Sequence, residues 1–150
     1  MKKPPKRSEL WLATARNIIQ DAGYQEYQGP NTELVAGADL VSVPMFQRDA
    51  VIGNSVYKTP YKATFFLADR SRFPNGLVVQ VNFQESSGST DRKFHFVVDS
   101  LLLSGRQTVL IVGGDGISQG CRSYLARRSA EEEMLTLLDH VDDLITLITD

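Results

Sequence analysis

Apolar residues recur along the chain with two different periods, and the alternation of these periods predicts both helices and strands. Steps of three and four residues predict a helix over residues 8–22, with Ser8 as its N-cap and Gly23 after its end. The same spacing predicts a second helix, for which Ser87-Gly88-Ser89-Thr90 offers a cap, with apolar residues from Phe94 to Leu102 and an end near Gly105. Residues 24–58 contain two short apolar runs between Gly and Pro breaks, so no regular element is predicted there.

Three further apolar segments have the composition of strands. They are an aromatic-rich segment over 61–69, an uncharged segment over 77–83 and a third segment over 108–112. Residues 74–76, Pro-Asn-Gly, have turn chemistry and join the first two segments as a hairpin. Helices and strands in this mixed order are typical of an α/β protein.

The C-terminal part of the chain predicts two more helices. A short basic helix over 118–128 comes first. An acidic helix over 130–149 follows, with Ser129 as its N-cap and three glutamates in its first turn. We expect its apolar stripe to pack against its own domain, with a dimer interface as the alternative. The stripe consists of Met134, Leu138, Val141, Ile145 and Ile148.

Charge is unevenly distributed, although the formal net charge of the 150-residue chain is only −2. Residues 130–150 contain seven acidic residues and no Lys or Arg, which leaves 16 basic and 11 acidic residues in 1–129. A basic body of this kind suits a polyanionic partner, while an ordinary solvated surface explains the same composition. We expect residues 1–7 to form a flexible basic arm and residues 8–150 to form a single domain.

Cysteine usage and hydropathy favour a cytoplasmic protein without a membrane anchor. Cys121 is the only cysteine, so it cannot form an internal disulfide, which fits a reducing compartment. No apolar run approaches the ~20 residues that span a bilayer, and the basic N-terminus lacks the apolar stretch of a secretory signal. His95 and His140 lack metal-ligand spacing, and the Gly-rich loop over 113–116 lacks the spacing of a phosphate-binding loop.

One face of the strand over 77–83 is unusual. Side chains alternate between the faces of a strand, so the amides of Gln80, Asn82 and Gln84 share one face. An unpaired buried amide costs about 1–3 kcal/mol. We therefore expect this face to meet polar partners, water or a cleft.

The stretch over 73–93 carries the most specific pattern. It contains an aromatic-Pro-Asn-Gly-Leu turn, an apolar strand that ends in Phe-Gln, and a Gly-Ser-x-x-x-Lys helix start. This ordered set resembles a family of bacterial and phage PD-(D/E)XK nuclease-like proteins, over about residues 50–128. The matching residues are Phe73, Pro74, Asn75, Gly76, Leu77, Phe83, Gln84, Gly88, Ser89 and Lys93. The resemblance implies a restriction-endonuclease-like core with a mixed central sheet of about four to five strands flanked by helices.

An active nuclease of this type needs an aspartate on one strand and Glu-x-Lys on the next, to hold Mg²⁺ and position a water. Where the resemblance places Glu and Lys, this chain has Gln80 and Asn82, and the aspartate falls near Thr64 or Phe65. We therefore expect a degenerate site without a cofactor, and Mg²⁺ only if the protein is active. The site positions are Thr64, Gln80, Asn82, Gln84 and Lys93, with Asp69 as a candidate metal ligand.

The resemblance implies a catalytically degenerate nuclease-fold protein that binds double-stranded DNA or acts as a partner subunit. The partner would be a second copy, an active nuclease or another defence or mobile-element protein. Two alternatives stay open: an active Mg²⁺-dependent endonuclease with relocated or partner-completed residues, and a protein-interaction module without DNA binding. The predicted DNA-binding residues are Lys58, Lys62, Arg70, Arg72 and Arg92.

Overall fold

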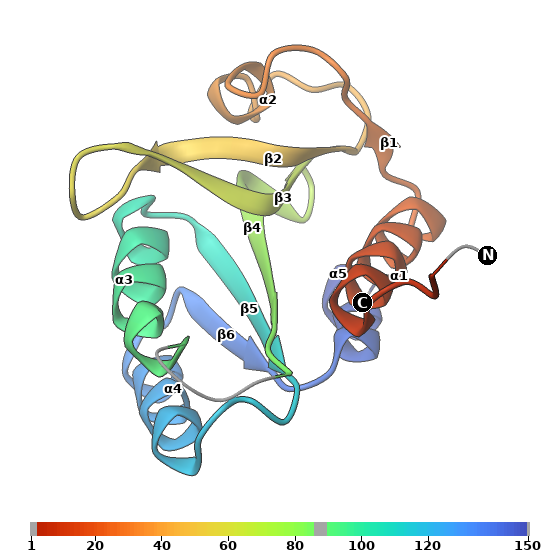
Figure 1. The fold of residues 1–150 in the computed structure, drawn as a ribbon. Coiled ribbons are helices and arrows are strands. Elements are labelled where there is room, and N and C mark those ends of the chain that lie inside the picture. Colours follow the sequence, from red (N-terminus) through yellow and green to blue (C-terminus); the bar gives the residue numbers. More distant parts are fainter. Residues whose placement is uncertain (1–2, 86–89, 150) are drawn as a thin grey trace.

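In the residues that the structure describes, 3–85 and 90–149, six strands form one mixed sheet in the order β1-β2-β3-β4-β5-β6. This computed structural model confirms the α/β class, with more strands than the four to five expected (Figure 1). β3 pairs antiparallel with both β2 and β4, whereas the remaining neighbours are parallel. The strands are β1 (Gln25–Glu26), β2 (Met45–Asn54), β3 (Pro60–Asp69), β4 (Phe73–Phe83), β5 (Gln107–Gly113) and β6 (Leu135–Leu138).

Helices cover both faces of the sheet, and each face has its own apolar core. On one face, α1 and α5 pack against alternate residues of the strands, such as Phe65, Val79 and Ile111. On the other face, α2, α3 and α4 cover residues such as Phe66 and Leu110. No helix in the described part of the chain is long and apolar enough to cross a bilayer. The helices are α1 (Arg7–Asp21), α2 (Glu33–Ala36), α3 (Thr90–Leu103), α4 (Gln119–Glu131), the 3-10 helix η1 (Val141–Asp143) and α5 (Leu144–Thr149).

The first helix is confirmed, but it begins one residue earlier than predicted. α1 starts at Arg7, so Ser8 lies inside the helix and is not its N-cap. The carboxylate of Glu9 accepts the backbone N–H of Lys6 at 3.3 Å and satisfies a donor at the helix start. Arg7 therefore belongs to α1, and the described residues before the helix, 3–6, are exposed.

The absence of regular structure predicted for residues 24–58 is wrong. This segment contains β1, α2 and the ten-residue strand β2. β2 interrupts its apolar pattern with Arg48 and Asp49, which hides the period of a strand in the sequence. Backbone pairing along nearly the whole of β3 forms the strand despite this interruption, because tertiary hydrogen bonds override a weak local pattern.

The hairpin between β3 and β4 turns earlier than the Pro-Asn-Gly sequence predicts. Asp69 pairs with Phe73, so the turn lies at residues 70–72, and residues 74–76 belong to an irregular part of β4. Gly76 has a φ of 85°, and the ring of Phe66 occupies the space 2.1 Å from where a Cβ would lie. Glycine is required here by close packing and by a left-handed backbone, not by a turn.

The acidic helix predicted over 130–149 is wrong. α4 continues to Glu131, and the chain then forms β6, η1 and the short helix α5. Leu135–Leu138 pairs in parallel with β5, so the backbone of these residues forms hydrogen bonds with a neighbouring strand instead of within a helix. The glutamates therefore lie at the end of α4 rather than in a first turn, where Glu132 contacts Arg128 at 3.9 Å.

Candidate functional site

The sheet splits between β3 and β4, and Thr64 and Gln80 lie at the split. Regular pairing of the two strands ends at Phe65 with Val79. Beyond this pair, β3 continues along β2 while β4 continues along β5. Figure 1 shows β2 and β3 turned away from the direction of β4, β5 and β6. The split opens backbone groups that need other hydrogen-bond partners.

The side chains of Thr64 and Gln80 supply these partners. The backbone N–H of Thr64 donates to Oε1 of Gln80 at 3.2 Å. In return, the backbone N–H of Val81 donates to Oγ1 of Thr64 at 3.0 Å. Thr64 and Gln80, the positions that correspond by resemblance to the aspartate and the glutamate of the nuclease motif, therefore lie close together. Both side chains are neutral, and their hydrogen bonds to the backbone stabilise the split.

A pocket of about 300 Å³ lies beside this split, between α1 and the strands β2 and β3. We call it the Thr64 pocket. Its charged lining consists of two guanidinium groups, from Arg16 and Arg48, and one carboxylate, from Asp49. The full lining comprises Leu12, Ala13, Arg16, Arg48, Asp49, Thr64 and Phe65.

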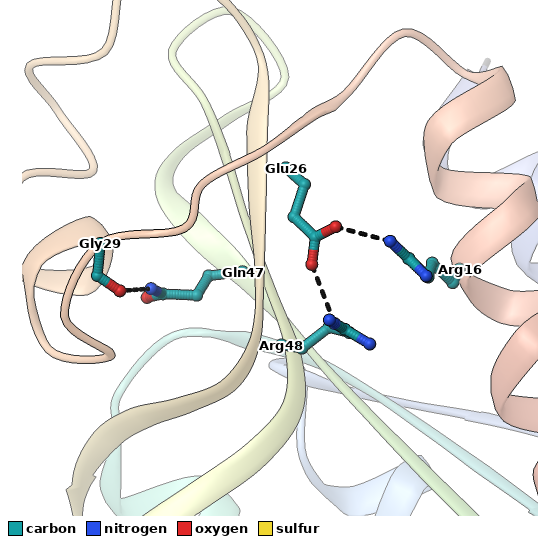
Figure 2. Close-up of polar contacts among 5 residues, drawn as sticks. All are labelled: Arg16, Glu26, Gly29, Gln47 and Arg48. Atoms are coloured by element: carbon teal, nitrogen blue, oxygen red, sulfur yellow. Dashed lines mark hydrogen bonds and ion pairs between the residues drawn. The ribbon is translucent and has the colours of Figure 1, made fainter.

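Glu26 holds both guanidinium groups in place (Figure 2). Nη2 of Arg16 donates to one carboxylate oxygen at 2.7 Å, and Nε of Arg48 donates to the other at 2.8 Å. The Glu26 side chain is 11% exposed, against 39% for Arg16 and 54% for Arg48. The carboxylate is therefore the covered centre of the network, and the arginines reach from it toward solvent.

The loop that leads from β1 to α2 is fixed to β2 beside this network. Nε2 of Gln47, which is 4% exposed, donates to the carbonyl oxygen of Gly29 at 2.9 Å (Figure 2). It also donates to the carbonyl oxygen of Pro30 at 3.2 Å. Gln47 and Arg48 are successive strand residues, so their side chains leave opposite faces of β2. One residue fixes the loop, and the next faces the pocket.

Asp49 is the acidic group of the Thr64 pocket. It lies across from Thr64, between the paired residues Arg48–Phe65 and Ala50–Ala63. Its φ of 52° is in the left-handed region, which is uncommon for a residue other than glycine inside a strand. Its carbonyl oxygen accepts Nδ2 of Asn31 at 3.2 Å, and its side chain is exposed.

Gln80 and Asn82 share a face of β4, as the alternation predicts. Gln80 pairs with Leu110 and Asn82 with Val112, both of which belong to the core under α3 and α4. Oδ1 of Asn82 is buried and has no hydrogen-bond partner among the described residues. An unpaired buried amide oxygen is costly, so this atom is a place where a donor from solvent or from a ligand fits.

The backbone of Gln84 joins the end of β4 to the Gly-rich loop over 113–116. Its N–H donates to the carbonyl of Gly113 at 2.9 Å, and its carbonyl accepts the N–H of Gly116 at 2.8 Å. A Cβ on Gly114 would lie 2.0 Å from the Gln84 carbonyl oxygen, so the Gly-rich loop and the end of β4 are in close contact. This contact explains Gly114 by packing, and a Cβ on Gly113 would lie 2.1 Å from the ring of Trp11. Ser87, Gly88 and Ser89, which complete the helix-start motif, lie outside the described residues.

The predicted basic residues fall into two separate groups. Lys58 and Lys62 lie on the hairpin between β2 and β3, and this hairpin contacts α3, which carries Arg92 and Lys93 in its first turns. Arg70 and Arg72 lie at the other end of β3. The eight residues from Lys62 to Arg70 span about 26 Å along a strand. The arginines of this turn therefore lie at the opposite end of β3 from the lysines.

Asp69 is buried and hydrogen-bonded, and it lies far from Thr64 along β3. Its carboxylate, on a residue that is 7% exposed, accepts Tyr24 Oη at 3.0 Å and Ser71 Oγ at 2.9 Å. Burial raises the pKa of the Asp69 carboxyl, but the hydrogen bonds from Ser71, Tyr24 and the backbone outweigh burial and lower the pKa overall. Burial together with the same carboxylate raises the pKa of the Tyr24 hydroxyl. Five residues separate Asp69 from Thr64, about 17 Å along the strand, so the two positions lie far apart on β3.

The residues at the split do not fit Mg²⁺. This cation requires oxygen ligands with negative charge, but Thr64, Gln80 and Asn82 bring none. Within the described ranges, no group of three or more His, Cys, Asp or Glu residues is arranged to hold a metal ion. The guanidinium groups of Arg16 and Arg48 in the Thr64 pocket instead have the donor geometry that binds an anion such as a phosphate.

The sequence interpretation missed Arg16, Glu26 and Arg48. Arg16 sits on the polar side of α1, and the other two lie in the segment to which no element was assigned. The one available signal is the position of Arg48 and Asp49 inside an otherwise apolar run. That signal indicates an interrupted strand, but it does not show that Glu26 reaches both arginines.

Fold and site together define an α/β protein whose mixed sheet splits beside an arginine-lined pocket. A family model of the PD-(D/E)XK nuclease superfamily domain matches residues 4–149, nearly the whole chain. The chain belongs to the PD-(D/E)XK nuclease superfamily, and the resemblance seen in the sequence is confirmed. The comparison with curated proteins and the comparison with solved structures found no match.

Proposed function

We propose that this protein is a nuclease-fold protein without hydrolytic activity that binds double-stranded DNA, alone or as a subunit beside an active nuclease. The observation that supports this proposal most is the chemistry at the split of the sheet. The side chains of Thr64 and Gln80 accept hydrogen bonds from the backbone, and two arginines line the adjoining pocket. The guanidinium groups offer donors to a phosphate group, and the neutral side chains at the split bring none of the charge that the divalent cation of hydrolysis needs.

The DNA-binding half of the proposal rests on the distribution of exposed cations. Arg16 and Arg48 reach solvent at the Thr64 pocket, and Lys58, Lys62 and Arg92 are exposed on the hairpin and on α3. Guanidinium groups bind phosphate oxygens in a two-pronged geometry, and lysines add charge. Contacts of this kind release counterions, so affinity for DNA falls steeply as salt rises.

The experiment is a cleavage and gel-shift panel on the purified protein. We expect retardation of a duplex at low salt, loss of the complex at high salt, and no nicking of a plasmid in Mg²⁺ or Mn²⁺. Replacing Arg16 and Arg48 together by Gln should weaken duplex binding. A protein that binds no DNA at low salt removes the DNA half of the proposal and favours a protein-interaction module.

A triple variant tests whether the charges are the missing part of a nuclease site. Thr64→Asp, Gln80→Glu and Asn82→Lys restore the ionic groups of the motif on strands that already hold positions 64 and 80 together. We expect weak metal-dependent nicking by this variant and none by the wild type. Nicking by the wild type contradicts the proposal.

One observation favours the alternative of an active endonuclease with a relocated acid. Asp49 lies across from Thr64 and lines the same pocket, so it is the carboxylate placed to replace the aspartate of the motif. Asp49→Ala decides this alternative. Wild-type nicking that disappears in Asp49→Ala, and persists in Asp69→Ala, supports the relocated site.

A further inference from the structure

The tip of the hairpin between β2 and β3 is a fixed loop rather than an open one. Ser55, which is 2% exposed, receives the backbone N–H of Tyr57 on its Oγ at 3.1 Å and the backbone N–H of Lys58 on its carbonyl at 2.9 Å. Oγ of Ser55 also contacts Oγ1 of Thr59 at 2.9 Å. The backbone N–H of Val56 donates to Oγ of Ser100 on α3 at 3.3 Å, which attaches the tip to the helix.

This loop presents an aromatic ring to solvent. Tyr57 is 76% exposed, and one face of its ring stacks on Phe96 of α3 at a centroid distance of 5.3 Å and an angle of 19°. Tyr61 supports Phe96 from the side, with an edge-to-face angle of 75° at 5.8 Å. Exposure of 76% leaves the outer face of Tyr57 uncovered. An exposed ring that is already stacked on a second ring loses little conformational entropy when a planar partner stacks on it.

Basic residues lie on both elements that carry these rings. Lys58 and Lys62 are exposed on the hairpin, with Lys62 on the face of β3 opposite Tyr61. Arg92 and Lys93 lie one turn before Phe96 on α3, and Asp99, one turn after it, pairs with Arg128. The chain has no acidic residue between Asp49 and Asp69, so no neighbouring carboxylate on the hairpin cancels the lysines.

The backbone of Lys58 adds an independent observation. Its φ of 63° lies in the left-handed region, where Gly or Asn is the usual residue. The loop holds a lysine in this conformation by the hydrogen bond to Ser55. Strain of this kind persists where the surroundings determine it, and it collects at sites that bind ligands.

We propose that Tyr57 and Phe96, flanked by Lys58 and Arg92, form a stacking platform for an unpaired base of single-stranded DNA. An open aromatic face beside cations that follow a phosphate backbone is the combination that binds single strands without sequence preference. The inference rests on the proposed DNA-binding function and specifies it: the protein engages duplex DNA next to an unpaired segment. Duplex DNA offers no free base face to Tyr57, so the platform distinguishes the two forms.

The test uses a single-stranded oligonucleotide with one 2-aminopurine, and the duplex of the same sequence, titrated with the full chain. We expect quenching of 2-aminopurine by the wild type on the single strand. Tyr57→Ala should weaken single-strand binding by roughly ten-fold or more, as loss of one stacked base does, and should abolish quenching. Tyr57→Phe should preserve both. Arg92→Gln should lower the slope of log affinity against log salt by about 0.7.

Leu40→Ala is the matched control, because Leu40 is exposed to 78% and its loss removes a similar apolar surface without an aromatic ring. Thermal unfolding of each variant verifies that the fold is intact. Equal single-strand binding by Tyr57→Ala and the wild type overturns the platform. Equal weakening by Leu40→Ala also overturns it.

The outcomes for the platform and for the proposed function are distinguishable. Duplex binding that is salt-sensitive, with single-strand binding insensitive to Tyr57→Ala, overturns the platform and leaves the DNA-binding proposal standing. No binding to either form overturns both. Single-strand binding that depends on Tyr57, without duplex binding, supports the platform and removes the duplex from the proposed function.

Discussion

Glu26→Gln separates the structural and the electrostatic role of the network at the Thr64 pocket. Glu26 accepts hydrogen bonds from Arg16 at 2.7 Å and from Arg48 at 2.8 Å, and its own side chain is 11% exposed. Glutamine keeps the shape but removes the charge that both guanidiniums share. The variant should lose stability and, because the two cations are released toward the pocket, should gain affinity for DNA.

The loss of stability follows from the exposure of the partners. A hydrogen bond to a charged group contributes about 1.5–3 kcal/mol when buried, but exposed ion pairs contribute about 0–1 kcal/mol. Arg16 and Arg48 are 39% and 54% exposed, so solvent screens the guanidinium ends and the sum is discounted. We expect a loss of about 1–2 kcal/mol in the free energy of unfolding. For a chain of this length the Tm falls by roughly 2–8 °C.

The change in DNA binding follows from the number of cations released. One additional phosphate contact steepens the dependence of log affinity on log salt by about 0.9 for duplex DNA. Urea unfolding measures the first effect, and fluorescence anisotropy over a salt series measures the second. The control is Glu133→Gln, which removes the same charge from an exposed side chain just after α4.

Two results refute this reasoning. If Glu26→Gln unfolds at the same urea concentration as the wild type, the network contributes no stability. If its DNA affinity and salt slope equal those of Glu133→Gln, the arginines of the pocket do not contact the phosphate backbone.

Two further predictions concern the contacts that hold the sheet together. The pKa of Asp69 is lowered in the folded protein, so its contribution to stability is present above the ordinary carboxyl value of 3.8 and is lost as pH falls through the lowered value. Asp69→Asn should therefore be less stable than the wild type at pH 7. Its urea midpoints at pH 7 and pH 3 should also differ less than those of the wild type. If the pH dependence is the same in both proteins, the lowered pKa of Asp69 does not contribute to stability. Gly114→Ala places a Cβ 2.0 Å from the carbonyl oxygen of Gln84, at a residue with a φ of 99°. This variant should lower the free energy of unfolding by more than about 1 kcal/mol. The control is Gly120→Ala, whose Cβ has its nearest neighbour at 3.9 Å and which should be neutral or stabilising.

The sequence alone determined the elements in which period and composition agree. α1, α3 and β5 lie where the spacing of apolar residues predicts them, within about three residues, because each buries its own regular face. The amides of Gln80 and Asn82 were assigned to one face of β4 by alternation, and the register with β5 bears this out. The ordered motif over 73–93 led to the family that the model over 4–149 shows.

Tertiary structure decided the elements whose stability comes from partners distant in the sequence. β2 exists because β3 pairs with it, and the segment over 135–138 is a strand because β5 has a free edge, although its spacing also matches a helix. The same holds for the site: Thr64 and Gln80 are 16 residues apart and meet through hydrogen bonds across the split. Glu26 joins Arg16 on a helix to Arg48 on a strand, and Tyr57 rests on Phe96 from another helix. A local pattern cannot encode these contacts, because each depends on how separate elements are placed in space.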